Sequence, residues 1–344
     1  MAVILKDVAN KLNVSISTVS KAINNRPGIS DELRSRILQT IEEMGYQSSV
    51  RVERTFFPAG GNTAPTINLS IRTNDSYLTE SFYTLISQEI TRQLQEHQYN
   101  ILFNVISKSD LSPDEFTSIF ESNNSNAFII IGADIDQRLF EEIKQTGVTT
   151  VLVDNDFDGF SSVNTDNVQG AQSAVEYLAG LGHRDILCLA GPLHHKSIQG
   201  RYQGYLRAIQ AQRLPGKPRL IECPGVSIND GLEAIASLKE IDFTAVFGCT
   251  DKLAIGAMKG LQKRGIKVPE QVSVMGFDDI EWGLHTEPEL TTVKTAKRQI
   301  ARMATKVVLD LLENQESYRM EVVIGTEILV RGSTGEVDGA GRTP

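Results

Sequence analysis

The segment from Leu5 to Gly45 constrains this chain most, because it holds three helical patterns that are each too short to fold alone. The first pattern carries four apolar residues at helical spacing: Leu5, Val8, Ala9 and Leu12. After a short break, the Ser15 hydroxyl can cap a second helix that runs to Ile23. A third helix is predicted from a cap at Ser30 to the terminator Gly45, with the apolar series Leu33, Ile37, Ile41 and Met44. We therefore predict a small three-helix domain with one shared core.

The second of these helices has an apolar side and a polar side. At about 100° per residue, its apolar side is formed by Ile16, Val19, Ala22 and Ile23. Ser17 and Lys21 point the opposite way and form a small polar face. A short helix, a turn and a capped helix make the outline of a helix-turn-helix, and such a face suits insertion into a DNA groove. The same pattern also fits an ordinary helical bundle in which Ser17 and Lys21 are simply solvated.

Four short motifs in this segment occur together: Val14-Ser15, Thr18-Val19-Ser20-Lys21, Asn24-Asn25 and Gly45-Tyr46. With them, the segment resembles the amino-terminal domain of the lactose-repressor (LacI/GalR) family of transcriptional regulators. The resemblance implies that the second helix lies in the major groove of DNA, with base contacts from Ile16, Ser17 and Lys21. It implies phosphate contacts from Ser15, Thr18, Ser20 and Asn24. By helical spacing Ile16 lies toward the core edge, so its expected partner is a thymine methyl group.

The charge distribution agrees with a DNA-binding head on an acidic body. Of the 34 basic and 43 acidic residues, eight and six lie in residues 1–60, so this region carries +2 and the remainder −11. Because phosphate neutralisation supplies most non-specific affinity, one head with so small a charge should bind weakly. We therefore expect a homodimer that presents two heads to double-stranded DNA with an inverted-repeat operator. The tail after residue 335 has no heptad repeat, so no further tetramerisation helix is expected.

Residues 47–65 follow the predicted head, residues 1–46, and are interpreted as a hinge or linker because the helical pattern ends there. Members of the family carry a short hinge helix at this point, whose leucine inserts into the minor groove. Here the matching positions read Val52-Glu53-Arg54-Thr55, which lack that leucine. The sequence therefore leaves open whether a hinge helix forms.

Residues 66–334 alternate strands and helices, which predicts an α/β body. The first series has strands near Ile67–Ile71, Ile101–Ile106, Phe128–Ile131 and Val151–Val153, and helices near Glu80–Glu96, Pro113–Ser122 and Asp136–Gln145. The second has strands near Ile186–Ala190, Ala245–Phe247 and Val272–Phe277, and helices near Gln169–Leu181, Gly200–Ala211, Gly231–Lys239 and Lys252–Arg264. A helix near Arg298–Leu312 and strands near Glu321–Ile324 and Glu327–Val330 follow.

Two doubly wound parallel sheets are thus expected, as in periplasmic-binding proteins. The expected first lobe is residues 66–162 plus 293–320, and the second is residues 163–292 plus 321–334, followed by a flexible tail, residues 335–344. Open α/β sheets bind ligands beyond the carboxyl ends of their strands, so two facing lobes should form a cleft.

The family resemblance continues through motifs such as Gly200-Arg201-Tyr202-Gln203-Gly204 and Gly276-Phe277-Asp278-Asp279. It implies a small effector, a sugar or sugar derivative, held by Arg201 and Asp278 with a further contact from Asp154. Thr250 stands where the family usually has asparagine, and Phe82 with Tyr83 could form an apolar wall. Lys297 would suit an acidic or phosphorylated effector. Alternatively, Arg201 and Asp278 form only a structural salt bridge across the cleft.

Other function classes find little support. The sequence has no P-loop, no G-x-S-x-G elbow and no H-E-x-x-H motif, so no catalytic residue, cofactor or metal is expected. Three separated cysteines and the absence of an amino-terminal signal peptide predict a cytoplasmic protein without disulfides. The alternatives are a solute-binding protein for carbohydrate uptake, which would need export, and an enzyme on the same scaffold. Neither explains the head.

Overall fold

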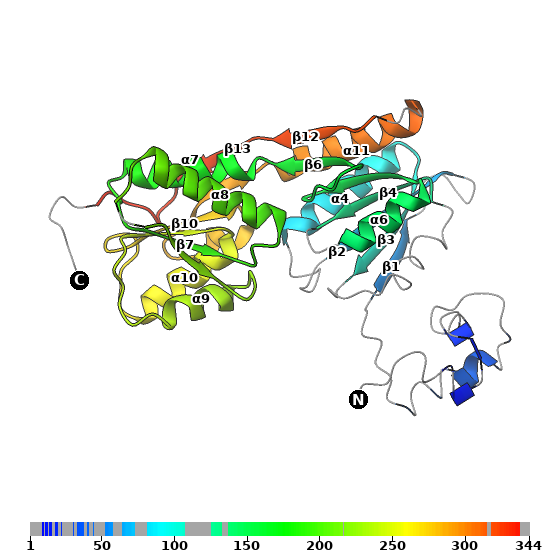
Figure 1. Ribbon diagram of the computed structural model, residues 1–344, viewed down its shortest axis with the longest axis horizontal. Coiled ribbons are helices and arrows are strands. Elements are labelled where there is room, and N and C mark those ends of the chain that lie inside the picture. Colours follow the sequence, from blue (N-terminus) through cyan, green and yellow to red (C-terminus); the bar gives the residue numbers. More distant parts are fainter. Residues whose placement is uncertain are drawn as a thin grey trace. The chain divides into compact units, whose positions relative to one another are not determined.

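The computed structural model divides into two compact units, Met1–Arg51 and Val52–Pro344 (Figure 1). In the first unit the structure describes residues 9, 11, 12, 14, 15, 18, 19, 22, 30, 33–37, 40 and 44. In the second unit it describes residues 52–57, 64–72, 81–106, 125–132, 137–215, 217–314 and 318–337.

The first unit has its own small core. Its buried apolar side chains come from all three predicted helices: Ala9, Val19, Ala22 and Ile37. Four partly buried side chains pack against them: Leu12, Val14, Leu33 and Met44. Because these are the positions that the helical spacing places inward, the described residues agree with the predicted shared core. Val14 was expected in the break between two helices, and it also contributes to the core.

The first lobe of the second unit is built on a seven-stranded sheet with the order β1-β3-β2-β4-β5-β6-β12. Its strands are β1 (Val52–Phe57), β2 (Thr66–Arg72), β3 (Asn100–Ile106), β4 (Ala127–Ile131), β5 (Thr149–Val153), β6 (Ser161–Thr165) and β12 (Glu321–Ile324). Neighbouring strands are parallel except for β1, which is antiparallel to β3. Helices α4 (Ser81–Glu96) and α11 (Lys297–Asn314) cover one face, and α6 (Gln137–Thr146) lies on the other (Figure 1).

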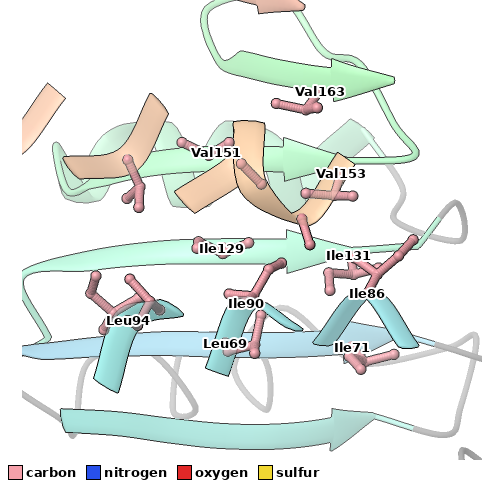
Figure 2. Close-up of a cluster of buried hydrophobic side chains, with 14 of the residues drawn as sticks. Leu69, Ile71, Ile86, Ile90, Leu94, Ile129, Ile131, Val151, Val153 and Val163 are labelled. Atoms are coloured by element: carbon pink, nitrogen blue, oxygen red, sulfur yellow. The ribbon is translucent and has the colours of Figure 1, made fainter. Parts of the chain in front are cut away.

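The core of this lobe lies between the sheet and the pair α4 and α11. Figure 2 shows Leu69 and Ile129 of the strands lying toward Ile86 and Ile90 of α4, and Val151 of β5 lying toward α11. These five side chains are completely buried. Strands β4 and β5 are almost continuously apolar because both of their faces are covered. The carboxyl ends of the parallel strands are thereby fixed at one edge of the sheet.

The second lobe has a six-stranded sheet with the order β13-β11-β10-β9-β7-β8. Its strands are β7 (Ile186–Ala190), β8 (Arg219–Glu222), β9 (Ala245–Gly248), β10 (Ser273–Asp278), β11 (Thr291–Thr295) and β13 (Thr326–Leu329), of which β13 is antiparallel. Helices α7 (Asn167–Gly180) and α8 (Lys196–Ala211) pack on one face, and α9 (Ile228–Ala236) and α10 (Asp251–Lys263) on the other. A short 3-10 helix, η2 (Glu281–His285), follows β10. The predicted pair of doubly wound sheets is confirmed.

The strand order corrects the expected lobe boundaries. Strand β6 pairs with β5, so the first lobe extends to Thr165 rather than ending at residue 162. Strand β11 pairs with β10 and stays in the second lobe, whereas β12 pairs with β6 and returns to the first. Hydrogen bonding along a strand keeps each strand with its partner, so the described chain crosses between the lobes after β6, β11 and β12.

The stretch expected to be a linker contains a strand. β1 pairs in register with β3, from Val52 opposite Ile106 to Phe57 opposite Ile101. The segment VERTFF is rich in β-branched and aromatic residues, which favour an extended backbone, and β3 would otherwise be an edge strand. The positions that match the family's hinge helix are therefore extended in this structure. The predicted helix near residues 113–122 lies outside the described residues.

Close packing of α7 on α8 gives a first testable prediction. A Cβ added to Gly204 would lie 2.2 Å from the carbonyl oxygen of Val168, far inside van der Waals contact. We expect Gly204→Ala to lower the free energy of unfolding by about 2 kcal/mol, because overpacking forces the helices apart. Denaturant unfolding would measure this loss. Gly180→Ala, in which the added Cβ meets nothing within 4 Å, is the control, and equal stability of both variants would contradict the prediction.

Candidate functional site

Two capping interactions shape the amino-terminal unit. The backbone N–H of Thr18 donates to Ser15 Oγ at 3.1 Å, and the two hydroxyl groups lie 2.7 Å apart. The N–H of Leu33 donates to Ser30 Oγ at 3.2 Å. Both serines thus cap helices as the sequence predicts, since an N-terminal amide has no partner within its own helix.

Of the predicted DNA contacts, Ser15 and Thr18 are described. The Ser15 side chain is exposed at the start of the second helix, and Thr18 is half-buried. Their proposed contacts with phosphates remain predictions. The other predicted contacts lie outside the described residues: Ile16, Ser17, Ser20, Lys21 and Asn24.

The predicted effector residues of the second unit gather where strands end. Asp154 follows β5 of the first lobe directly, Asp278 is the last residue of β10, and Thr250 follows β9. Arg201 projects from α8, and Phe82 lies in the first turn of α4. All five residues are buried. The expectation that ligands bind beyond the carboxyl ends of strands is consistent with this placement.

Arg201 is held on three sides. Its Nη2 lies 2.8 Å from Asp278 Oδ1, its Nε donates to Asn167 Oδ1 at 2.8 Å, and its Nη1 donates to the carbonyl oxygen of Cys249 at 2.7 Å. The guanidinium also lies 3.9 Å from the centroid of the Phe277 ring. These bonds use three of the five N–H groups of arginine, so the fixed fork still has donors to offer a ligand. The salt bridge lies within the second lobe, not across the two lobes.

Asp154 brings a second carboxyl group to the site from the first lobe. Tyr83 donates its hydroxyl to Asp154 Oδ2 at 2.9 Å. Burial raises the pKa of Asp154 to about 6, although the positive charge of Arg201 acts in the opposite direction. Burial also raises the pKa of Asp278, again against the effect of Arg201. Two buried carboxyl groups, one from each lobe, therefore interact electrostatically with the same guanidinium group.

The raised pKa of Asp154 gives a prediction about pH. Between about pH 4 and pH 6 the folded chain binds more protons at Asp154 than the unfolded chain, so stability falls as the pH rises through this window. We expect Asp154→Asn to be more stable than the wild type above pH 6, by on the order of 2 kcal/mol, and this advantage to vanish near pH 4. Denaturant midpoints from pH 4 to 7 would test it. Parallel profiles for both proteins would contradict it.

Thr250 has a structural role that the sequence did not suggest. Its hydroxyl oxygen accepts the N–H of Leu253 at 3.2 Å and so caps α10. The next residue, Asp251, accepts the N–H of Ile280 at 2.8 Å and the hydroxyl of Thr292 at 2.5 Å. Burial raises the pKa of Asp251 to about 7. Asp251 thereby ties α10 to the turn that carries Asp278, and the available signal was its position at the start of the helix that follows the buried strand β9.

The sequence suggested that the charge of Lys297 could bind an acidic or phosphorylated effector. In the structure its ammonium group binds backbone carbonyl groups instead. Its Nζ donates to the carbonyl oxygen of Asp278 and, at 2.9 Å, to that of Asp279. The ammonium group also lies 5.7 Å from the centroid of the Phe82 ring. The side chain is buried. Because backbone carbonyls already accept from this ammonium group, Lys297 gives no support for an acidic or phosphorylated effector.

An ion pair between the two lobes was not predicted from the sequence. Lys196 Nζ, in the first turn of α8, lies 2.8 Å from Asp156 Oδ1, just after β5. Both side chains are partly exposed, so the pair contributes little to stability by itself. It shows that the two lobes approach each other beside Asp154. In the part of the chain that the structure describes, no group of three or more His, Cys, Asp or Glu side chains is arranged to hold a metal ion.

Comparisons with known proteins cover both units. Residues 4–49 match the bacterial regulatory proteins of the lacI family, and residues 175–334 match the periplasmic binding protein-like domain. The chain is 29% identical over 335 residues to the probable HTH-type transcriptional repressor ExuR of Bacillus subtilis, which covers 96% of this chain and 98% of that protein. It is 28% identical over 338 residues to the HTH-type transcriptional repressor CytR of Escherichia coli, covering 97% and 96%.

Solved structures share the fold. The transcriptional regulator CelR in complex with cellobiose has a TM-score of 0.72 at 23% identity, covering 96% of this chain and 99% of that chain. The lac repressor dimer bound to operator and the anti-inducer ONPF has a TM-score of 0.68 at 21% identity, covering 97% and 100%. Among the described residues, no helix is both long and apolar enough to span a membrane. With a capped helix-turn-helix unit, two doubly wound lobes and similar repressors along nearly its whole length, the chain carries the DNA-binding domain of the lacI family of bacterial regulatory proteins, followed by a periplasmic binding protein-like domain.

Proposed function

We propose that this protein is a transcriptional repressor whose affinity for its operator is controlled by a small, hydroxyl-rich effector bound between the two lobes. The observation that carries the proposal is the buried Arg201–Asp278 pair at the ends of the second lobe's strands, with Asp154 approaching from the first lobe. A guanidinium offers fixed donors and a carboxylate offers acceptors, a combination that suits neighbouring hydroxyl groups. No covalent step is proposed, so the effector should be recovered unchanged.

The charge of the site favours an uncharged effector. Asp154 and Asp278 together bring two carboxyl groups against the one guanidinium of Arg201, and Lys297 donates to backbone carbonyls instead. An added carboxylate or phosphate would be repelled by the two buried acids at short range. Solved relatives carry uncharged sugars, cellobiose in CelR and ribose in a regulator from Enterococcus faecium, which is consistent with this choice.

On the DNA side, we propose that a homodimer acts in the cytoplasm on an inverted-repeat operator. The outward face of the second helix, including Ser17 and Lys21, would read bases, and Ser15 with Thr18 would contact phosphates. Effector binding would change operator affinity through a coupling free energy of about 1–3 kcal/mol, which corresponds to one or two decades.

A thermal-shift screen tests the effector class. The panel holds neutral sugars, the corresponding sugar phosphates and uronic acids, and nucleobases. We expect a neutral polyhydroxylated compound to stabilise the protein, by about 2.7 kcal/mol at 100 times its dissociation constant. Stabilisation by a phosphorylated or acidic sugar but not by its neutral parent would contradict the proposed effector class.

A further inference from the structure

The turn that carries the effector contact Asp278 has an unusual backbone. Asp278 has a φ of 120° and Asp279 a φ of 53°, in the region that side-chain-bearing residues seldom adopt. Such a conformation persists only when the surrounding structure holds it in place. The contacts that hold this turn therefore decide where the Asp278 carboxylate lies.

Besides the Arg201–Asp278 salt bridge, three contacts come from the second lobe itself. Asp251 accepts the N–H of Ile280 at 2.8 Å, Arg331 Nη2 lies 2.6 Å from Asp279 Oδ1, and the Thr295 hydroxyl donates to the carbonyl oxygen of Asp278 at 3.1 Å. These contacts hold the turn within the second lobe and do not depend on the position of the first lobe.

A further contact comes from the other lobe. Lys297 is the first residue of α11, and this helix packs into the core of the first lobe through Ile300, Ala301 and Ala304. From there its Nζ donates to the carbonyl oxygens of both Asp278 and Asp279. The same ammonium group faces the ring of Phe82 in the first lobe. One side chain thus connects the core of the first lobe with the strained turn of the second.

We propose that Lys297 is a positioning residue that sets the placement of the effector turn relative to the first lobe. Without its ammonium group, two buried carbonyl groups lose a charged donor, and the turn keeps contacts only to its own lobe among those described. The lobes would then sample a wider range of separations. The proposal rests on the proposed function where it treats Asp278 as an effector contact, but the lobe geometry can be measured without a ligand.

The experiment measures the distance between the lobes in the full chain by pulsed electron spin resonance. Spin labels are placed at Gln145→Cys on α6 and Lys263→Cys on α10, both exposed positions. The native cysteines Cys188, Cys223 and Cys249 are buried and at most 3% exposed, so they should stay unlabelled. Labelled chain is mixed with an excess of unlabelled chain, so that only distances within one chain are recorded.

We expect Lys297→Met to widen the distance distribution about twofold, because a hinge freed of one contact samples more states. Lys297→Arg keeps a charged donor and should restore a narrow distribution. Lys294→Met is the matched control, since this nearby lysine is exposed and contacts Glu327 instead. Arg331→Met should loosen the turn inside its own lobe and leave the interlobe distances unchanged.

A distribution for Lys297→Met that matches the wild type would overturn the proposal, as would a failure of Lys297→Arg to narrow it. If Lys297→Met does not fold, Lys297→Gln, which keeps an uncharged donor, is measured in its place under the same two criteria. No effector enters these measurements. A failed ligand screen would therefore count against the proposed function and leave this result as it stands.

Discussion

Arg201→Ala should abolish the thermal stabilisation by the effector and lower the free energy of unfolding of the second unit by about 3–5 kcal/mol. The guanidinium is 4% exposed and its partner carboxylate 12%, so removing one leaves the other buried and uncompensated. The carbonyl of Cys249 and the side chain of Asn167 lose their donor at the same time. Denaturant unfolding and thermal shift with the effector would measure the two losses.

Two further variants separate charge from geometry. Arg201→Lys keeps the positive charge but not the planar fork, so we expect it to recover part of the stability and little of the effector binding. Arg219→Ala is the matched control, because Arg219 pairs with Asp242 at a partly exposed site and its loss should cost less than about 1 kcal/mol. Full effector binding by Arg201→Ala would show that the buried pair is only structural.

Lys21→Ala should weaken binding to the cognate operator by about 1–3 kcal/mol, a tenfold to hundredfold loss, because a base-contacting side chain is removed. The effector should stabilise this variant as it stabilises the wild type, since Lys21 belongs to the other compact unit. Fluorescence anisotropy with operator DNA at fixed salt, next to the thermal-shift assay, would measure both. Arg201→Ala is expected to show the reverse pattern at temperatures where it is folded.

Lys263→Ala removes the same charge from the exposed end of α10 and should leave operator binding unchanged. An equal loss of operator and effector binding in Lys21→Ala would mean that Lys21 supports the fold instead of reading bases. An equal loss of affinity for operator and random DNA would identify a phosphate contact.

The strands that could be predicted from the sequence are those with continuous apolar runs. The run Ile186–Ala190 is a buried central strand, and its predicted bounds equal those of β7. Strand β6 has the sequence SSVNT, and β8 is half exposed, so neither shows the apolar pattern of a central strand. β6 pairs with the distant strand β12, and β8 pairs with β7 across helix α8; local sequence patterns do not record such pairings.

The same limit applies to the site. The resemblance supplied Arg201, Asp154 and Asp278, and the structure brings Arg201 of α8 to Asp278 at the end of β10, with Asp154 at the end of β5. It did not indicate which groups the Lys297 ammonium group binds. A lysine that binds a ligand and a lysine that binds backbone carbonyl groups cannot be distinguished in the sequence. Which groups it binds depends on how α11 packs in the first lobe while the acceptors lie in the second.

The three chain crossings, after β6, β11 and β12, limit how the lobes can move. A single connection would allow twisting and sliding, whereas three lines of backbone leave bending about their common axis as the soft mode. Gly325, at the crossing between β12 and β13, has open space where a Cβ would stand, so it can absorb backbone rotation there. Ligand binding anywhere between the lobes would therefore change mainly one quantity, the angle between the two lobes about that axis.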